Sequence, residues 1–186
     1  QVISGKKPIT VVIPGMMAST LANGDDVWWI DYGDFVSRRL LDMKMEINLT
    51  AKGLVATAYE KFCKFLITNG HDVYTLPYDW RQSYDNQMND TKAHFENILK
   101  SSNNQPIRVV THSKGGLLFR QFCATHHDLY LKLSNINGFR WIMLGTPWYG
   151  SYAAVKTLIG QSKTLKNLRM ISLFVSYKKL LEVFSK

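Results

Sequence analysis

The sequence predicts an α/β fold with a parallel sheet that carries helices on both faces. Four short runs rich in β-branched and aromatic residues are typical of buried strands. They are Ile9–Ile13, Val73–Leu76, Ile107–Val110 and Arg140–Leu144. Segments with apolar residues at helical spacing lie between these runs. Strand and helix therefore alternate along the chain, and a parallel sheet with crossover helices is the architecture typical of that order.

Each helical segment is bounded by a start or stop signal. The first covers Leu54–Leu66 and ends at Asn69-Gly70, because glycine is favoured just after a helix C-terminus. The second covers Asn86–Leu99 and is followed by the turn-rich stretch Ser101–Pro106. The third begins near Gly115, directly after the third strand.

The composition of the 186 residues fits a folded domain, since 46% are hydrophobic and 20% are charged. The formal net charge is +9, which could attract nucleic acid or an anionic membrane surface. The basic residues are scattered, however, and no nucleic-acid-binding motif accompanies them. We therefore expect a solvated basic surface and no nucleic-acid partner. No uninterrupted apolar run approaches the roughly 20 residues that span a bilayer.

The cysteines and histidines give no indication of a metal site. Cys63 and Cys123 each lie in an apolar helical pattern, which favours two buried free thiols over a disulfide. The two cysteines and five histidines lack the spacing of metal ligands, and no Walker-type glycine loop is present. We expect no metal and no cofactor.

Two stretches depart from the alternating pattern. Val27–Lys52 is less regular, and we expect an insertion over the sheet edge. Residues 161–186 mix apolar and basic side chains, as in an amphipathic helix at a lipid surface. The alternative, which we favour, is a core or cap helix whose partners lie beyond the end of this chain. Residues 1–160 are thus expected to form the N-terminal part of the domain, and residues 161–186 the start of a helical cap or lid, or a connecting segment.

The strongest functional signal is the segment Val109–Gly116. A strand runs into a tight turn at Ser113 and a helix follows at once, as in a nucleophile elbow that lifts the serine Oγ to a helix N-terminus. Small residues are needed two before and two after the serine, because strand and helix approach closely there. Gly115 meets this requirement, whereas Thr111 stands where glycine or alanine is usual.

The first strand supplies a second element of such a site. It ends in Pro14-Gly15-Met16, a turn able to aim a backbone N–H at a carbonyl oxygen. The N–H groups of Met16 and Lys114 would together form an oxyanion hole. Ser113 is accordingly the expected catalytic nucleophile.

At this point the chain resembles the lecithin–cholesterol acyltransferase-like lipases and phospholipases of the α/β-hydrolase superfamily. Four blocks match in the family's order: Ile13–Ser19 with Val27-Trp28, Leu76–Arg81, His112–Leu117 and Leu144–Ser151. Pro77-Tyr78-Asp79-Trp80-Arg81 is the most specific of them. The blocks span residues 9 to about 160, and their spacing most resembles bacterial members.

The resemblance implies an α/β-hydrolase-type sheet that is incomplete at its C-terminal side. The four expected strands correspond to the third to sixth of that sheet. The family places a catalytic aspartate after the seventh strand and a histidine after the eighth, in the chain order serine, acid, histidine. We therefore expect a further segment or a partner chain to supply both residues.

The histidines within the chain are poor candidates for the catalytic base. His112 adjoins Ser113, but the residue before the serine points away in such an elbow and packs structurally. His126 and His127 lie about four helical turns further on, too far to take the serine proton. His71 and His94 lie next to helix ends, and we expect them at the surface.

Several other side chains have two interpretations. Trp28 and Trp29 either contact an acyl chain or pack ordinarily, and Trp148 and Tyr149 either bind substrate beside the elbow or belong to the core. We expect the Lys114 side chain to be solvated near the site entrance, where it could also meet a phosphate headgroup.

Asp79 and Arg81 could likewise shape the rim of the site. We favour a structural ion pair for them.

These residues together predict a serine hydrolase acting on lipid carboxylic esters, such as a lipase, a phospholipase A or an acyltransferase. Its partners would be a lipid or ester substrate and a membrane or lipid surface. The alternative is a catalytically inactive binding module that keeps the hydrolase scaffold. Thr111 in the turn and the missing catalytic base both favour this alternative.

Overall fold

The computed structural model describes residues 3–29, 43, 46–159 and 161. Four parallel strands form the main sheet in the order β5-β1-β6-β7. The strands are β1 (Ile9–Ile13), β5 (Asp72–Thr75), β6 (Ile107–His112) and β7 (Arg140–Leu144). The expected parallel sheet and its four strands are therefore confirmed. β1 is central and every one of its side chains is buried, as expected for a strand covered on both faces.

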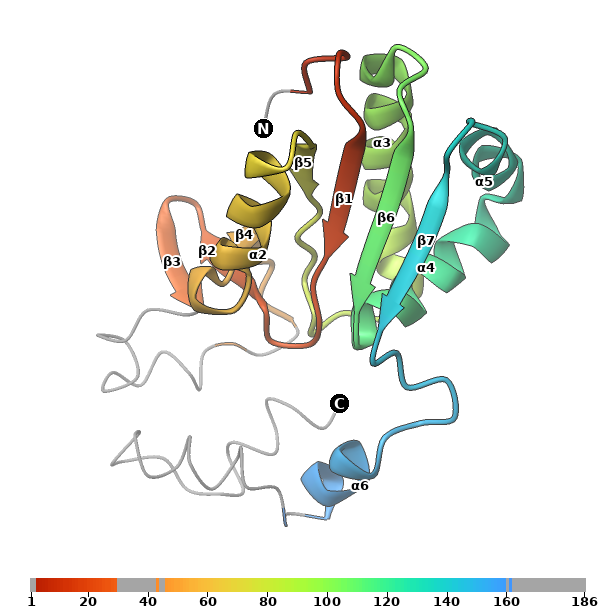
Figure 1. The fold of residues 1–186 in the computed structure, drawn as a ribbon. Coiled ribbons are helices and arrows are strands. Elements are labelled where there is room, and N and C mark those ends of the chain that lie inside the picture. Colours follow the sequence, from red (N-terminus) through yellow and green to blue (C-terminus); the bar gives the residue numbers. More distant parts are fainter. Residues whose placement is uncertain (1–2, 30–42, 44–45, 160, 162–186) are drawn as a thin grey trace. The chain divides into compact units, whose positions relative to one another are not determined.

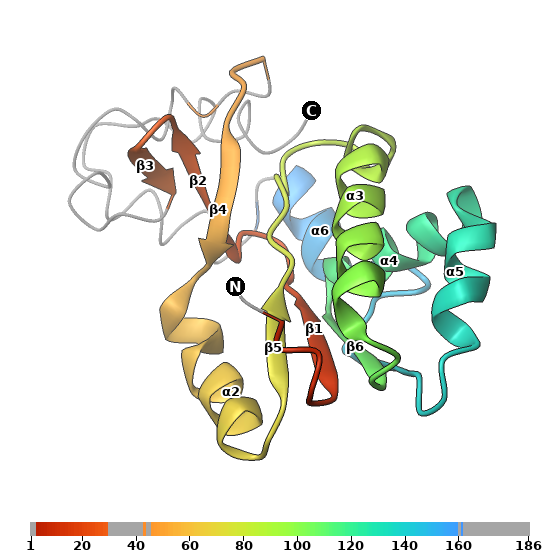
Figure 2. The same cartoon turned by 90° about the horizontal axis from the view of Figure 1, so that it is seen from above.

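Helices cover both faces of this sheet, as predicted (Figures 1 and 2). α2 (Ala56–Thr68) lies on one face, and α3 (Tyr84–Ser102) and α4 (Lys114–Thr125) lie on the other. The short helix α5 (His127–Ser134) packs against α3 and α4. The aromatic rings of Phe95, Phe119 and Phe122 pack together between α3 and α4, and Trp141 of β7 meets Phe119 edge-on.

Local signals explain where the helices begin and end. The Ser83 hydroxyl accepts the Asn86 N–H at the start of α3, and Asn103 adopts a left-handed conformation at its end. α2 stops at Asn69, one residue before the positive-φ Gly70. Cys63 and Cys123 are free and half-buried on α2 and α4. Burial raises the pKa of both thiols, that of Cys123 to about 12.

A second, three-stranded sheet was not predicted. It consists of β2 (Ser19–Asn23), β3 (Asp26–Trp29) and β4 (Thr50–Leu54), in the order β3-β2-β4. β3 and β4 lie at the two ends of the stretch Val27–Lys52 that we expected to be irregular. These strands contain Asn, Asp, Lys and Gly and are partly exposed, so they lack the apolar runs that identify a buried strand.

The chain divides into two compact units, residues 1–19 with 52–146, and residues 20–51 with 147–186. The short helix α6 (Tyr152–Leu158) belongs to the second unit. Residue 161 is the one described position of the stretch 161–186. The expected boundary near residue 160, and the nature of the tail, stay predictions.

β7 differs from β1 in its exposure. β7 is an outer strand of the sheet, and Ile142, Met143 and Leu144 are 44%, 43% and 46% exposed. Apolar side chains on a strand of a parallel sheet are ordinarily covered. β7 therefore leaves part of its apolar surface exposed, unlike β1.

Candidate active site

Ser113 occupies the turn between β6 and α4, in an unusual backbone conformation. Its φ is 50° and its ψ is −122°, a positive φ that side-chain-bearing residues rarely adopt. Such a conformation costs of order 1–3 kcal/mol and persists only where the surroundings hold it. Here the Ser113 N–H donates to the Leu144 carbonyl at 2.8 Å, and the Gly116 N–H donates to the Ser113 carbonyl at 3.0 Å. The turn places Ser113 at the N-terminus of α4, whose first N–H groups have no acceptor within the helix.

Glycine is required where α4 meets the end of β1. A Cβ atom at Gly115 would lie 2.8 Å from the Ile13 carbonyl oxygen and closer still to that of Pro14. A Cβ at Gly116 would collide with the Thr146 side chain. The need for a small residue two positions after Ser113 is therefore confirmed.

Thr111 replaces the small residue expected on the other side of the turn, and the structure accommodates it. Its side chain is fully buried. The hydroxyl donates to the Ile142 carbonyl at 3.4 Å and accepts the Trp141 indole N–H at 3.1 Å. Residues of β7 thus provide both hydrogen-bond partners of the Thr111 hydroxyl, and the turn at Ser113 forms with Thr111 in place.

The loop after β1 lies directly beside Ser113. A Cβ at Gly15 would be 3.2 Å from the Ser113 Cβ and 3.0 Å from the His112 Nδ1. The Gly15 N–H donates to the Tyr59 hydroxyl at 2.9 Å, and that hydroxyl also lies 2.7 Å from the His112 Nδ1. Sequence reasoning missed Tyr59, since no pattern on its helix distinguishes it. Met16, the next residue of the loop, is 46% exposed.

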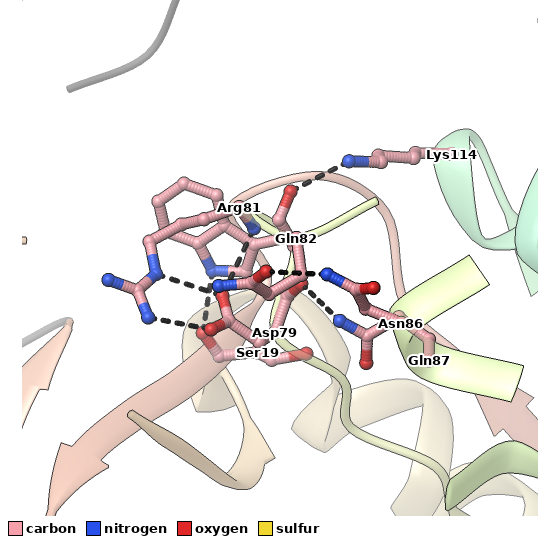
Figure 3. Close-up of polar contacts among 8 residues, drawn as sticks. Ser19, Asp79, Arg81, Gln82, Asn86, Gln87 and Lys114 are labelled. Carbon is pink, nitrogen blue, oxygen red and sulfur yellow. Dashed lines mark hydrogen bonds and ion pairs between the residues drawn. The ribbon is translucent and has the colours of Figure 1, made fainter. Parts of the chain in front are cut away.

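The Lys114 side chain is half-buried and hydrogen-bonded, whereas we expected it to be solvated. Its Nζ donates to the Trp80 carbonyl at 2.7 Å (Figure 3) and lies 5.3 Å from the centroid of the Tyr84 ring. Burial lowers the pKa of Lys114, while the nearby Asp79 carboxylate partly opposes that shift. A cavity of about 330 Å³ adjoins the side chain and is lined also by residues 82–85 and Gln121.

Asp79 and Arg81 form the expected structural ion pair. The Arg81 Nε and Nη2 donate to the two Asp79 carboxylate oxygens at 2.9 and 2.6 Å (Figure 3). Both residues are buried. The Gln87 side-chain amide donates to the Asp79 carbonyl at 2.9 Å, and the Trp80 indole N–H donates to the Ser19 carbonyl at 3.2 Å. The segment after β5 is thus clamped to its neighbours by a polar network.

The four aromatic candidates for substrate binding differ in exposure. Trp29 is 3% exposed and packs in the interior, and the half-buried Trp28 donates its indole N–H to Asp26 at 3.2 Å. Trp148 is 42% exposed and Tyr149 is fully exposed, so neither is a core residue. A role of these residues in substrate binding stays a prediction.

Two histidines expected at the surface are partly buried and hydrogen-bonded. His71 bonds the Thr10 hydroxyl at 2.8 Å and the Arg108 guanidinium at 3.0 Å. His94 bonds the Tyr74 hydroxyl at 2.6 Å. In the part of the chain that the structure describes, no histidine is hydrogen-bonded to the Ser113 side chain.

The described residues contain no cluster of three or more His, Cys, Asp or Glu side chains suited to holding a metal ion. None of their helices is both long and apolar enough to cross a bilayer.

Comparison with known proteins agrees with this arrangement. The family model for lecithin:cholesterol acyltransferase matches residues 42–184. Lecithin-cholesterol acyltransferase-like 4 of Arabidopsis thaliana is 29% identical over 58% of this chain and 20% of its own length. Phospholipase A(1) LCAT3 of the same plant is 28% identical over 57% of this chain and 22% of its own.

The chain therefore matches about a fifth of the length of these relatives. The bacterial character expected from the block spacing stays a prediction. The family model covers well over half of the chain, including the β6–α4 turn and the segment after β5. The chain belongs to the lecithin:cholesterol acyltransferase family.

Proposed function

We propose that this chain carries the nucleophile and the oxyanion hole of a serine hydrolase or acyltransferase that acts on lipid carboxylic esters. The observation that carries the proposal is the positive φ of Ser113, in a turn held between β6 and α4. A strained serine between a strand and a helix is typical of the nucleophile elbow, which presents Oγ above the sheet. The family membership supports an acyl ester of a lipid as the substrate class.

Ser113 would attack the ester carbonyl, and the acyl group would pass to its Oγ as the alcohol leaves with a proton. The backbone N–H groups of Met16 and Lys114 would hold the developing oxyanion. The Gly15 contact with Ser113 supports this assignment, because it brings the loop that carries Met16 next to the serine. Water or a second lipid hydroxyl would then accept the acyl group.

Serine is a weak nucleophile at neutral pH unless a base takes its proton. A histidine and an aspartate from a further segment or a partner chain would complete the site. The rival function is an inactive binding module. The two hydrogen bonds of Thr111 remove one argument for that rival, since this residue fits the elbow without distortion.

A fluorophosphonate probe tests the proposal on the native protein. We expect covalent labelling of Ser113 and ester turnover, both abolished by Ser113→Ala, since loss of the serine lowers kcat by about 10⁶-fold in a serine protease. Ser134→Ala is the control, because the Ser134 hydroxyl bonds the Leu131 carbonyl within α5 and should be dispensable. Equal labelling of wild type and Ser113→Ala would refute the nucleophile. A folded native protein that neither labels nor turns over esters would favour the binding module.

A further inference from the structure

The loop after β1 is held by a hydrogen-bond chain that crosses three elements. The Gly15 N–H donates to the Tyr59 hydroxyl at 2.9 Å, and the hydroxyl lies 2.7 Å from the His112 Nδ1. Tyr59 comes from α2 and is 8% exposed, whereas His112 is the last residue of β6 and immediately precedes Ser113. These two hydrogen bonds thus connect the loop after β1 to the strand β6, which ends just before Ser113.

The Tyr59 hydroxyl serves both of its partners at once. Its oxygen accepts the Gly15 N–H. The bond to the His112 Nδ1 runs in the direction that the imidazole tautomer sets. Burial raises the pKa of Tyr59, an effect that the Gly15 bond partly opposes, so the hydroxyl keeps its proton at neutral pH.

This arrangement bears on the proposed oxyanion hole. One proposed donor is the N–H of Met16, adjacent to Gly15, and the other is the N–H of Lys114, two residues after His112. A Cβ at Gly15 would lie 3.0 Å from the His112 Nδ1, so the loop and the end of β6 are already in close contact. A shift of the Gly15 peptide would rotate the next N–H away from the position where charge develops. Such donors act only when they are oriented in advance.

We propose that Tyr59 and His112 are positioning residues, which orient the Met16 N–H by holding the Gly15 peptide. This inference rests on the proposed function of the site. Neither side chain touches the reacting atoms in this role. Each acts through the backbone of the loop.

The fold contains a matched control for this pair. The Tyr74 hydroxyl lies 2.6 Å from the His94 Nδ1, and the two rings are 5.8 Å apart at 69°. The rings of Tyr59 and His112 are 6.0 Å apart at 63°. The control pair joins β5 to α3 and has no bond to Gly15. Tyr74→Phe therefore removes an equivalent hydrogen bond without disturbing the loop.

The experiment measures kcat, KM and Tm of the native protein and its variants with p-nitrophenyl butyrate as substrate. We expect Tyr59→Phe to lower kcat by about 10–100-fold with KM nearly unchanged, below the 10²–10³-fold cost of deleting an oxyanion donor outright. Tyr74→Phe should keep the wild-type kcat. The Gly15 amide should exchange with solvent faster in Tyr59→Phe than in Tyr74→Phe.

His112 variants provide an independent test that does not depend on Tyr59→Phe folding. His112→Ala should lower kcat as Tyr59→Phe does. His112→Asn places an amide near the Nδ1 position and should restore most of the loss.

An active wild type whose Tyr59→Phe variant keeps its kcat, or equal kcat values for His112→Ala and His112→Asn, would overturn the inference. A wild type that neither labels at Ser113 nor turns over the ester would instead refute the proposed function itself.

Discussion

At the amino ends of the strands, a cluster of hydrogen-bonded side chains links neighbouring strands, whereas at the carboxyl ends close backbone contacts surround Ser113. Before β5, His71 lies between the Thr10 hydroxyl and the Arg108 guanidinium. At the opposite end, α4 approaches β1 so closely that Gly115 leaves no room for a Cβ, and Ser113 holds a positive φ. Side-chain contacts tolerate replacement at the cost of a hydrogen bond, but close backbone contacts tolerate no added atom.

The difference indicates where this fold concentrates its strain. Ligands of open α/β sheets bind outside the carboxyl ends of the strands, and strained residues cluster at functional sites. Ser113 and the loop after β1 lie at that end. Substitutions there should affect activity and stability together, whereas substitutions at the amino end should affect stability alone.

The largest expected loss of stability comes from the buried ion pair after β5. Arg81→Met leaves the Asp79 carboxylate buried without its partner, and breaking such a pair costs about 3–5 kcal/mol. We expect a correspondingly large fall in the free energy of unfolding measured by urea titration. Lys92→Met is the control, since the Lys92–Glu96 pair on α3 is half-exposed and such pairs contribute little. Similar losses of unfolding free energy in the two variants would mean that the buried Asp79–Arg81 pair contributes no more to stability than an exposed pair.

Gly115→Ala tests the close backbone contact at the carboxyl end. The added Cβ would force α4 away from the carbonyl groups of Ile13 and Pro14, and overpacking of this kind costs about 1–3 kcal/mol. Because a small displacement of catalytic groups can cost about 10²-fold in rate, activity should fall by at least that factor.

Gly70→Ala provides the comparison for Gly115→Ala. Gly70 has a φ of 82° but open space around it, so its substitution should lower Tm and leave kcat unchanged. A wild-type kcat in Gly115→Ala would contradict the claim that activity depends on the close approach of α4 to the end of β1.

The smallest expected effect is the acid sensitivity of two partly buried histidines. Burial lowers the pKa of His71, and Arg108 lowers it further. Burial also lowers the pKa of His94, partly opposed by Asp90. The unfolded chain takes up protons near the ordinary value of 6.5, whereas the folded chain does so at lower pH. Their contribution to stability is therefore complete above the unfolded pKa and is lost as pH falls through the lowered folded values.

We accordingly expect Tm to fall as the pH drops below the ordinary histidine value of 6.5. His71→Gln should make this fall shallower, because it removes one of the two groups while keeping an acceptor for Arg108. An identical pH profile in the variant would exclude His71 as a contributor.

Local sequence signals identified the main sheet well. The runs beginning at Ile9 and Ile107 became β1 and β6, since buried parallel strands are continuous apolar segments. The run beginning at Arg140 became β7, whose apolar residues gave the same signal although they are exposed. The turn at Ser113 was predicted from the strand before it and the two glycines after it. β2, β3 and β4 were missed, because short, partly exposed strands acquire their identity from their neighbours.

The side-chain partners were harder to predict. Lys114 was expected in solvent, but the Trp80 carbonyl lies within reach of its Nζ. Tyr59 gave no signal, because its importance depends on Gly15 and His112, which are 44 and 53 residues away in sequence.

Neighbouring residues along the chain were enough to predict the alternating α/β order, the position of Ser113 in its turn and the small residue at Gly115. Each of these was predicted from a local pattern of strand, turn and helix residues. The hydrogen-bond partners of the polar groups around that turn became known from the folded chain: Tyr59 for Gly15, β7 for Thr111 and Trp80 for Lys114. A buried donor or acceptor must find a partner, and the packing of segments far apart in the sequence determines which one lies within reach.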